Sequence, residues 1–101
     1  MTVTRVIRYR TKPDRAEENE RLIRDVFAEL AATDPGGLWY AAFRLDDGVT
    51  FVHLAQTADG ENPLATSAAF ARFQSDIGDR CDDGPVPAEA TVIGDHGLLR
   101  G

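Results

Sequence analysis

A β-hairpin predicted over residues 38–57 carries the side chains with the most chemical potential. The sequence Asp46-Asp47-Gly48-Val49 favours a tight type I′ turn, because Asp-Gly tolerates the positive φ that such a turn needs at both central positions. This turn sets Arg44 opposite Phe51. Since opposed and alternate residues share a face, one face of the hairpin carries four candidate site residues: Tyr40, Arg44, Phe51 and His53.

His53 is the candidate catalytic residue of this face. An imidazole has an ordinary pKa of about 6.5, so it can accept a proton near neutral pH. A phenol or quinol would need such a deprotonation before it passes electrons to O₂, and we therefore predict that His53 is a general base. The alternative is a half-buried histidine that is hydrogen-bonded at a dimer seam.

Two arginines and two aromatic residues are candidate substrate-binding residues. Arg44 and Arg8 could bind an anionic or carbonyl-bearing ligand, because guanidinium is a charged, planar fork of donors. Tyr40 and Phe51 could enclose an aromatic ring. The alternatives are salt bridges across a dimer for the arginines and barrel packing for the aromatic residues.

The sequence offers no metal-binding or cofactor-binding pattern, so we expect neither a metal nor a cofactor. Cys81 is the only cysteine, which excludes an internal disulfide and a multi-cysteine metal site. Asp79, Asp82 and Asp83 form an acidic cluster that is typical of a solvated loop. The glycines do not have the spacing of a phosphate-binding loop.

Six elements must position these residues, and apolar periodicity with turn signals locates them. The predicted elements are a strand at 2–11, a helix at 14–33, strands at 38–46 and 49–57, a helix at 63–80 and a strand at 86–96. Residues 58–61 are predicted to be a loop. An alternative start of the second helix, at Ser67, would leave residues 63–66 as a preliminary turn.

The order β-α-β-β-α-β favours one α+β domain over residues 1–101 with a ferredoxin-like fold. Its antiparallel sheet has the strand order 4-1-3-2, and both helices cover one face. We expect the helices to cover the more apolar hairpin face, which includes Trp39, Phe43, Val52 and Leu54.

The other sheet face, with His53, is then left open. We expect Val6 and Arg8 of the first strand on this open face and Ile7 and Tyr9 under the helices. Because the open face still carries apolar side chains, we predict a symmetric homodimer in which two sheets meet and enclose a barrel lumen. Arg8, Arg44 and His53 would gather in that lumen.

The charge balance limits the partners. The chain has 17 acidic and 11 basic residues and a formal net charge of −6, which argues against binding to nucleic acid and to an anionic membrane surface. It has no apolar stretch long enough to cross a membrane. The first ten residues lack the continuous apolar segment of a signal peptide, so we expect the protein in the cytoplasm.

Two segments resemble a known group of proteins. The hairpin reads GLWYAAFRLDDGVTFVHLAQ, and the second helical region contains SAAFARFQSDI, a Ser67-x-x-Phe70-x-x-Phe73 pattern. Together with the first strand and helix, they resemble the dimeric α+β-barrel superfamily, and within it the antibiotic-biosynthesis-monooxygenase-like proteins. The resemblance covers nearly the whole chain.

The resemblance implies several activities. Some members oxidise quinol-like polyphenols with O₂ and without a cofactor, others cleave haem, and others have no assigned reaction. The helices of this chain have no histidine, so the haem-cleaving residue set is absent. Many relatives have a histidine before the Ser-x-x-Phe pattern, where this chain has Pro63-Leu64-Ala65-Thr66.

We therefore expect a cofactor-independent oxidation of a small aromatic or quinol-type compound in a pocket between sheet and helices. In this hypothesis His53 is the base, Arg44 and Arg8 orient substrate oxygens, and Tyr40 and Phe51 shape the pocket. One alternative is a non-catalytic dimer that binds a ligand or partner, which the missing histidine favours. Another is an isomerase or cyclase for polyketide-like substrates.

Overall fold

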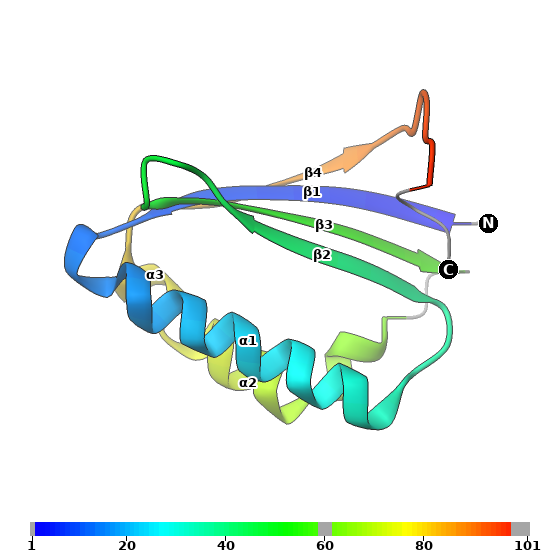
Figure 1. The fold of residues 1–101 in the computed structure, drawn as a ribbon, viewed down its shortest axis with the longest axis horizontal. Coiled ribbons are helices and arrows are strands. Elements are labelled where there is room, and N and C mark those ends of the chain that lie inside the picture. Colours follow the sequence, from blue (N-terminus) through cyan, green and yellow to red (C-terminus); the bar gives the residue numbers. More distant parts are fainter. Residues whose placement is uncertain (1, 59–61, 98–101) are drawn as a thin grey trace.

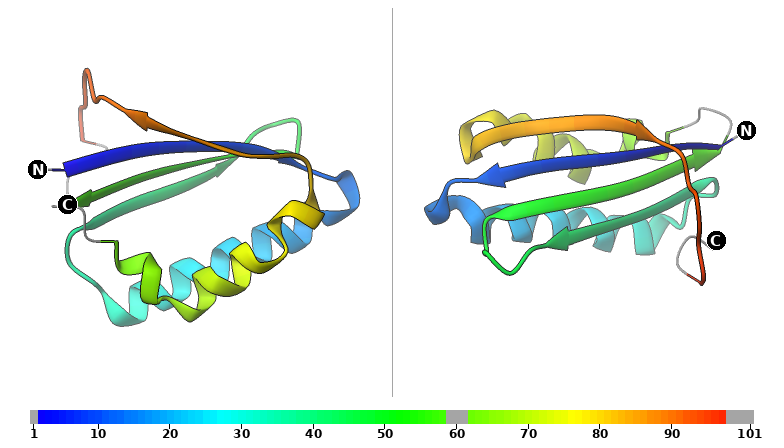
Figure 2. Two further views of the ribbon diagram at one scale, coloured as in Figure 1. Left: turned by 180° about the vertical axis from the view of Figure 1, so that it is seen from behind. Right: turned by 90° about the horizontal axis from the view of Figure 1, so that it is seen from above.

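The computed structural model describes residues 2–58 and 62–97 and has the predicted ferredoxin-like architecture (Figure 1). The sheet order is β2-β3-β1-β4 with antiparallel neighbours, which is the predicted order 4-1-3-2 read from the other edge. The helices lie together on one face of the sheet, and the four strands lie side by side in the view from above (Figure 2). The strands are β1 (Thr2–Thr11), β2 (Leu38–Arg44), β3 (Thr50–Ala58) and β4 (Cys81–Ala90).

The first predicted helix agrees with the structure to within two residues, whereas the single helix predicted over 63–80 is wrong: the alternative start at Ser67 is confirmed, and the helix is interrupted at Asp76. A short 3₁₀ turn precedes α2, and Ser67 caps α2 because its hydroxyl accepts a hydrogen bond from the backbone N–H of Phe70 at 3.0 Å. Residues 59–61 of the predicted loop lie outside the described residues. The helices are α1 (Ala16–Thr33), α2 (Ala68–Ser75) and α3 (Ile77–Arg80), with 3₁₀ turns η1 (Pro13–Arg15) and η2 (Pro63–Thr66).

The β2–β3 hairpin has the predicted register, but the predicted turn type is wrong. Arg44 pairs with Phe51, as expected. Gly48 has a positive φ of 79°, whereas Asp47 does not, so the turn is not of type I′. The carboxylate of Asp47 instead accepts hydrogen bonds from the backbone N–H groups of Val49 and Thr50 at 2.9 and 2.8 Å. The hydroxyl of Thr50 donates to the same carboxylate, and this bond together with the two backbone bonds lowers the pKa of Asp47 to about 2.

The last strand begins earlier than predicted. β4 starts at Cys81 rather than at residue 86, and it ends at Ala90 rather than at 96. The segment that was expected to be a loop extends along β1, where Arg10 pairs with Asp83. Because β4 is an edge strand, Pro85 and Pro87 fit in it without breaking a ladder on both sides.

The prediction of which hairpin face the helices cover is wrong. Tyr9, Phe51 and His53 are buried under the helices, and the ring of Tyr40 stacks on Phe27 of α1 with centroids 5.0 Å apart. We call this the covered face. The strand pairing explains it, since Ile7 and Tyr9 lie opposite His53 and Phe51 and must share their face.

The opposite side of the sheet carries many apolar side chains and has no helix or strand over it in the described structure, although the segment after β4 passes over one end (Figure 2). Phe43 is 45% exposed and Val86 64% exposed, although the prediction placed Phe43 in the core. Trp39 is only half-buried and lies on this side as well. We call this side the uncovered face, and its apolar residues are Val6, Trp39, Ala41, Phe43, Val52, Leu54, Val86 and Ala88.

None of the helices in residues 2–58 and 62–97 is both long and apolar enough to cross a membrane.

Candidate functional site

A chain of hydrogen bonds crosses the covered face from β1 to β2. The hydroxyl of Tyr9 lies 2.8 Å from Nε2 of His53, and Nδ1 of His53 lies 2.6 Å from the hydroxyl of Tyr40. Each residue comes from a different strand, β1, β3 and β2, so the sheet register sets the spacing. Both ring nitrogens of His53 therefore have a tyrosine partner.

The same chain continues into the helices. Nδ2 of Asn19 on α1 lies 2.9 Å from the hydroxyl of Tyr9, and Nε of Arg80 on α3 lies 3.1 Å from Oδ1 of Asn19. Asn19 and Arg80 are both fully buried. The chain thus joins three strands and two helices by four consecutive hydrogen bonds: Arg80, Asn19, Tyr9, His53 and Tyr40.

Arg80 is a buried cation without a carboxylate partner among the described residues. Its Nη2 donates to the backbone carbonyl of Phe73 at 2.6 Å, its guanidinium lies 5.3 Å from the centre of the Phe73 ring, and its Nη1 has no hydrogen-bond partner among the described residues. A buried charge is costly, and donors without acceptors raise the cost. Its Nε donates to Oδ1 of Asn19, so Arg80 fixes the orientation of that buried amide.

A small cavity lies next to the tyrosine–histidine chain. It measures about 150 Å³ and lies between the covered face, η2 and α2. We call it the inner pocket. Leu64, Phe70 and Phe73 line it beside Tyr9, Tyr40 and His53, and its further polar residues are Arg5, Thr57, Asn62 and Gln74. The inner pocket therefore combines an apolar wall with hydroxyl and imidazole groups, the usual composition of a small-molecule site.

Burial controls the protonation of this site. Removal from water lowers the pKa of His53 to about 4, so the imidazole is neutral at pH 7. Burial also raises the pKa of Tyr9 and of Tyr40 far above the ordinary value of a phenol. The ordinary histidine pKa that suggested a base near neutrality does not hold in this fold.

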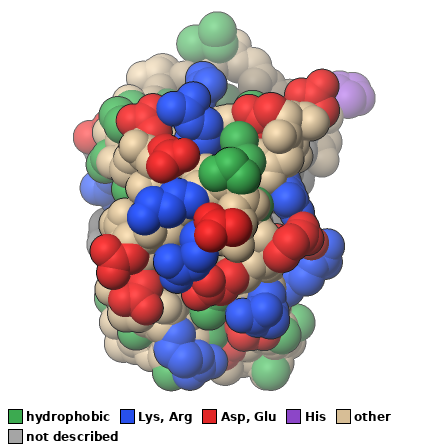
Figure 3. All heavy atoms as spheres, turned by 90° about the vertical axis from the view of Figure 1, so that its left-hand side faces the viewer, with side chains coloured by type: hydrophobic (Ala, Val, Ile, Leu, Met, Phe, Trp, Pro, Cys, Tyr) green, Lys and Arg blue, Asp and Glu red, His purple; other side chains and the backbone are tan. Residues whose placement is uncertain are grey.

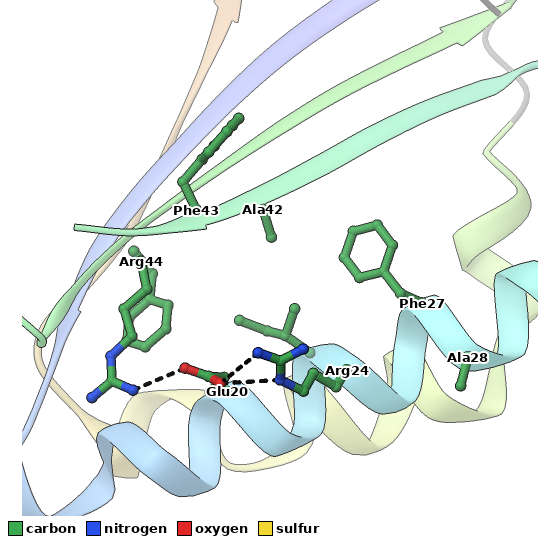
Figure 4. Close-up of a pocket in the computed structure, with 9 residues that line it drawn as sticks. Glu20, Arg24, Phe27, Ala28, Ala42, Phe43 and Arg44 are labelled. Carbon is green, nitrogen blue, oxygen red and sulfur yellow. Dashed lines mark hydrogen bonds and ion pairs between the residues drawn. The ribbon is translucent and has the colours of Figure 1, made fainter. Parts of the chain in front are cut away.

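Arg44 lies at a different cavity, the outer cleft, of about 540 Å³ between α1 and β2 (Figure 4). Its Nη1 donates to Glu17 and to Glu20 at 2.7 and 2.9 Å, and its Nε donates to the backbone carbonyl of Gly48. Phe51 also lines the outer cleft, under the guanidinium of Arg44. Arg44 is therefore occupied by partners within its own chain.

The end of the molecule with the β2–β3 turn and the start of α1 has no surface of one charge. Figure 3 shows acidic and basic side chains interspersed there. Besides the contacts of Arg44, Arg15 pairs with Glu18 and Arg24 with Glu20. Since the charges are paired locally, this end offers no broad attraction to an anionic ligand.

The predicted site residues consequently divide among three places. His53 and Tyr40 meet at the inner pocket, and Arg44 and Phe51 lie at the outer cleft. Arg8 is exposed on the uncovered face, between Val52 and Val86 of the flanking strands. The expected grouping of Arg8, Arg44 and His53 in one lumen is wrong, because the register places Arg8 on the opposite side of the sheet.

The sequence did not reveal three members of the hydrogen-bonded chain. Asn19 could have been suspected, because it lies on the apolar stripe of α1 with Ala16, Ile23 and Val26, where a polar residue needs a buried partner. Tyr9 was expected to be core packing. Arg80 had no signal, since an arginine at the end of a helix is ordinary.

No three His, Cys, Asp or Glu side chains in the described parts of the chain gather where they could hold a metal ion. Cys81 is buried, and burial raises the pKa of its thiol, which keeps it protonated.

Solved structures with this architecture are numerous, although their sequences are distant. A protein from Bacteroides thetaiotaomicron named as a candidate antibiotic biosynthesis monooxygenase has a TM-score of 0.79 at 18% identity, covering 99% of this chain and 96% of its own. Another with that name, from Nitrosomonas europaea, has a TM-score of 0.74 at 14% identity, covering 95% and 94%. The chain has their fold.

A third structure bears on assembly. A protein from Jannaschia that is named a dimeric ferredoxin-like protein of unknown function has a TM-score of 0.67 at 13% identity and covers 91% of this chain and 100% of its own. No protein-family model and no curated protein sequence matches the chain. The resemblance found in the sequence is therefore confirmed for the fold.

Proposed function

We propose that the inner pocket binds a small aromatic compound with oxygen substituents and promotes its oxidation by O₂ without a cofactor. One observation carries the proposal: His53 is held between Tyr9 and Tyr40 at the wall of a largely apolar cavity. An apolar cavity of about 150 Å³ is large enough for a benzene-sized molecule. Two solved structures with this fold are named as monooxygenases, a class of enzymes that also uses O₂ as the oxidant.

The proposed reaction is balanced with O₂ as the oxidant. A quinol gives up two electrons and two protons, the O–H bonds break, and O₂ accepts both pairs to form H₂O₂ while the quinone leaves. The protein binds the ring, excludes water and places Tyr40 against a substrate oxygen. His53 acts through Tyr40, because both imidazole nitrogens are already engaged.

The proposal is tested by O₂ uptake and H₂O₂ formation with methylhydroquinone, measured above the rate without protein. We expect wild-type protein and His96→Gln, which changes the exposed histidine, to accelerate the oxidation equally. Tyr40→Phe and His53→Gln should lose most of the acceleration. No acceleration by the wild type, or an unchanged rate in both pocket variants, would contradict an oxidase.

A second candidate function is a non-catalytic ligand-binding module. One observation favours it: the imidazole of His53 has no free nitrogen, and burial lowers its pKa to about 4, so no free base faces the inner pocket at neutral pH. Retention of a small aromatic compound in native mass spectrometry, together with no O₂ uptake, would favour binding over oxidation.

We also propose that the protein is a homodimer that buries the uncovered face. Exposed apolar side chains such as Phe43 and Val86 are grouped on that face, and a contiguous exposed apolar surface usually marks an interface. The structure from Jannaschia with this fold is named dimeric. The inner pocket lies on the covered face, so each copy would keep its own pocket.

A further inference from the structure

The hydrogen-bonded chain on the covered face has a direction, which means that each bond has a defined donor and acceptor, and Arg80 sets this direction. A guanidinium has only donors, so the group that Nε of Arg80 meets at 3.1 Å must be the carbonyl oxygen of Asn19. The amide group of Asn19 then directs its NH₂ to the hydroxyl of Tyr9, at 2.9 Å. The orientation of an amide that is usually ambiguous is here fixed by its partner.

The direction passes from Tyr9 to His53. The hydroxyl oxygen of Tyr9 accepts from Asn19, and its single proton needs an acceptor, because an unpaired buried donor is costly. Nε2 of His53 lies 2.8 Å away and is the acceptor on hand. If Nε2 donated instead, the phenolic proton of Tyr9, a residue that is only 3% exposed, would have no partner among the described residues, whereas Tyr40 is half-buried and can direct its proton into the inner pocket. Nε2 of His53 is therefore unprotonated.

The direction ends at Tyr40. A neutral imidazole with an unprotonated Nε2 has its proton on Nδ1, so Nδ1 of His53 donates to the hydroxyl oxygen of Tyr40 at 2.6 Å. The hydroxyl proton of Tyr40 is then left to point elsewhere. No acceptor for it exists among the described residues, and Tyr40 lines the inner pocket.

We infer that Arg80 and Asn19 are positioning residues that hold His53 in its Nδ1–H tautomer, and that Tyr40 consequently presents a hydrogen-bond donor to the inner pocket. The pocket then selects ligands with an acceptor oxygen, a carbonyl or a phenolate, over ligands that offer only a donor. The selectivity rests on the proposed function, because it requires that the inner pocket binds a ligand. The assignment of the His53 tautomer does not depend on ligand binding.

The tautomer is measured directly by NMR on protein with ¹⁵N-labelled histidine. The polypeptide has only two histidines, so the signals that remain in His96→Gln belong to His53. We expect His53 to be neutral at pH 7, with the proton on Nδ1. A proton on Nε2, or an exchanging mixture of both tautomers, would overturn the inference whether or not any ligand binds.

Asn19→Asp tests whether Asn19 sets the direction. A carboxylate of the same shape still pairs with Arg80, but it can only accept, so Tyr9 must donate to it. Nε2 of His53 must then donate to Tyr9, and the tautomer should switch to Nε2–H. A purely structural role would not reverse a tautomer, so an unchanged Nδ1–H signal in folded Asn19→Asp overturns the assignment to Asn19.

The matched control is Asn62→Asp, the same chemical change at the only other asparagine. Its side chain accepts from the backbone N–H of Leu64, and a carboxylate can do the same. Asn62→Asp should keep the Nδ1–H tautomer. A switch in this variant would show that added charge, rather than the direction of the chain, moves the proton.

Three bicyclic probes of similar size test the selectivity. 1-Indanone offers a carbonyl acceptor, indole offers an N–H donor, and indane offers neither. We expect wild-type protein to bind 1-indanone roughly threefold to tenfold more tightly than indole or indane, the gain of one net hydrogen bond. In Asn19→Asp, Tyr40 donates inward to His53, and the preference should move to indole.

The outcomes separate the two proposals. Equal affinity for 1-indanone and indole in the wild type overturns the selectivity but leaves the pocket in place. Binding of none of the probes contradicts both the proposed function and the selectivity, whereas the tautomer still stands or falls on its own NMR signal.

Discussion

Nδ1 of His53 lies 2.6 Å from the hydroxyl of Tyr40, although the two residues are not directly opposite in the β2–β3 ladder. Ala42 is the partner of His53, and Tyr40 lies two residues farther along β2. Diagonal neighbours on one face are within reach of long side chains. Tyr9 is likewise diagonal to His53 across the β1–β3 pair. His53 therefore joins two tyrosines, one on each of the strands that flank β3.

Because His53 is buried in its neutral state, we predict that the free energy of unfolding decreases as the pH is lowered. Its pKa is about 4 in the fold, against about 6.5 in an unfolded chain, so the unfolded state binds the proton first as pH falls. The stability is fully present above pH 6.5 and is lost toward pH 4. From about pH 7 to pH 5 we expect a loss of about 2 kcal/mol in the free energy of unfolding.

Urea unfolding at both pH values measures this loss. His53→Gln should remove most of the dependence between pH 7 and pH 5, whereas the exposed-residue control His96→Gln should keep it. If His53→Gln does not fold, the NMR titration of His53 in the wild type gives its pKa directly. A pKa near 6.5 would contradict the prediction.

The two tyrosines should differ in their contribution to stability. Tyr9→Phe removes the hydroxyl between Asn19 and His53 and leaves two buried polar groups without partners, which we expect to cost about 2 kcal/mol. Tyr40→Phe removes the end of the chain beside the inner pocket and should cost about 1 kcal/mol or less. Thermal and urea unfolding compare the two, and equal losses would show that Tyr40 is as enclosed as Tyr9.

The elements and their order could be predicted from the sequence because they depend on local signals. The apolar stripe of α1, the Asp-Gly turn and the cap at Ser67 act within a few residues, and the hairpin register followed from the turn position. The start of β4 depended on a partner far away in the chain. Residues 81–85 have turn-like composition, but β1 offered an edge with which they could pair.

The site was harder to predict because it depends on which face meets the helices. The prediction assumed that the helices cover the more apolar face, which is the face with Phe43 and Val52. This assumption fails when a face is apolar for a reason other than contact with the helices. The pairing of Tyr9 with Phe51 would have decided it, since Tyr9 was already expected under the helices. The partners Asn19 and Arg80 come from separate helices, and no sequence spacing links them to His53.

Arg80→Lys should destabilise the protein although it keeps the charge. Arg80 donates from Nε to Asn19 and from Nη2 to the carbonyl of Phe73, and a lysine ammonium cannot occupy both positions. We expect a loss of about 2 kcal/mol in the free energy of unfolding. Arg72→Lys on the exposed side of α2 is the matched control and should be neutral. Equal free energies of unfolding for the two variants would show that the contacts of Arg80 make no net contribution to stability.

The uncovered face predicts how the protein assembles. Phe43 on β2 and Val86 on β4 are exposed at opposite edges of that face, so an interface there would bury both. Phe43→Glu with Val86→Glu should turn a wild-type dimer into a folded monomer, because an unpaired charge would be buried at the interface. Ala32→Glu, on the exposed side of α1, should stay dimeric. Native mass spectrometry reads the masses, and a wild type that is strictly monomeric at micromolar concentration would mean that the sheet leaves this apolar face in water.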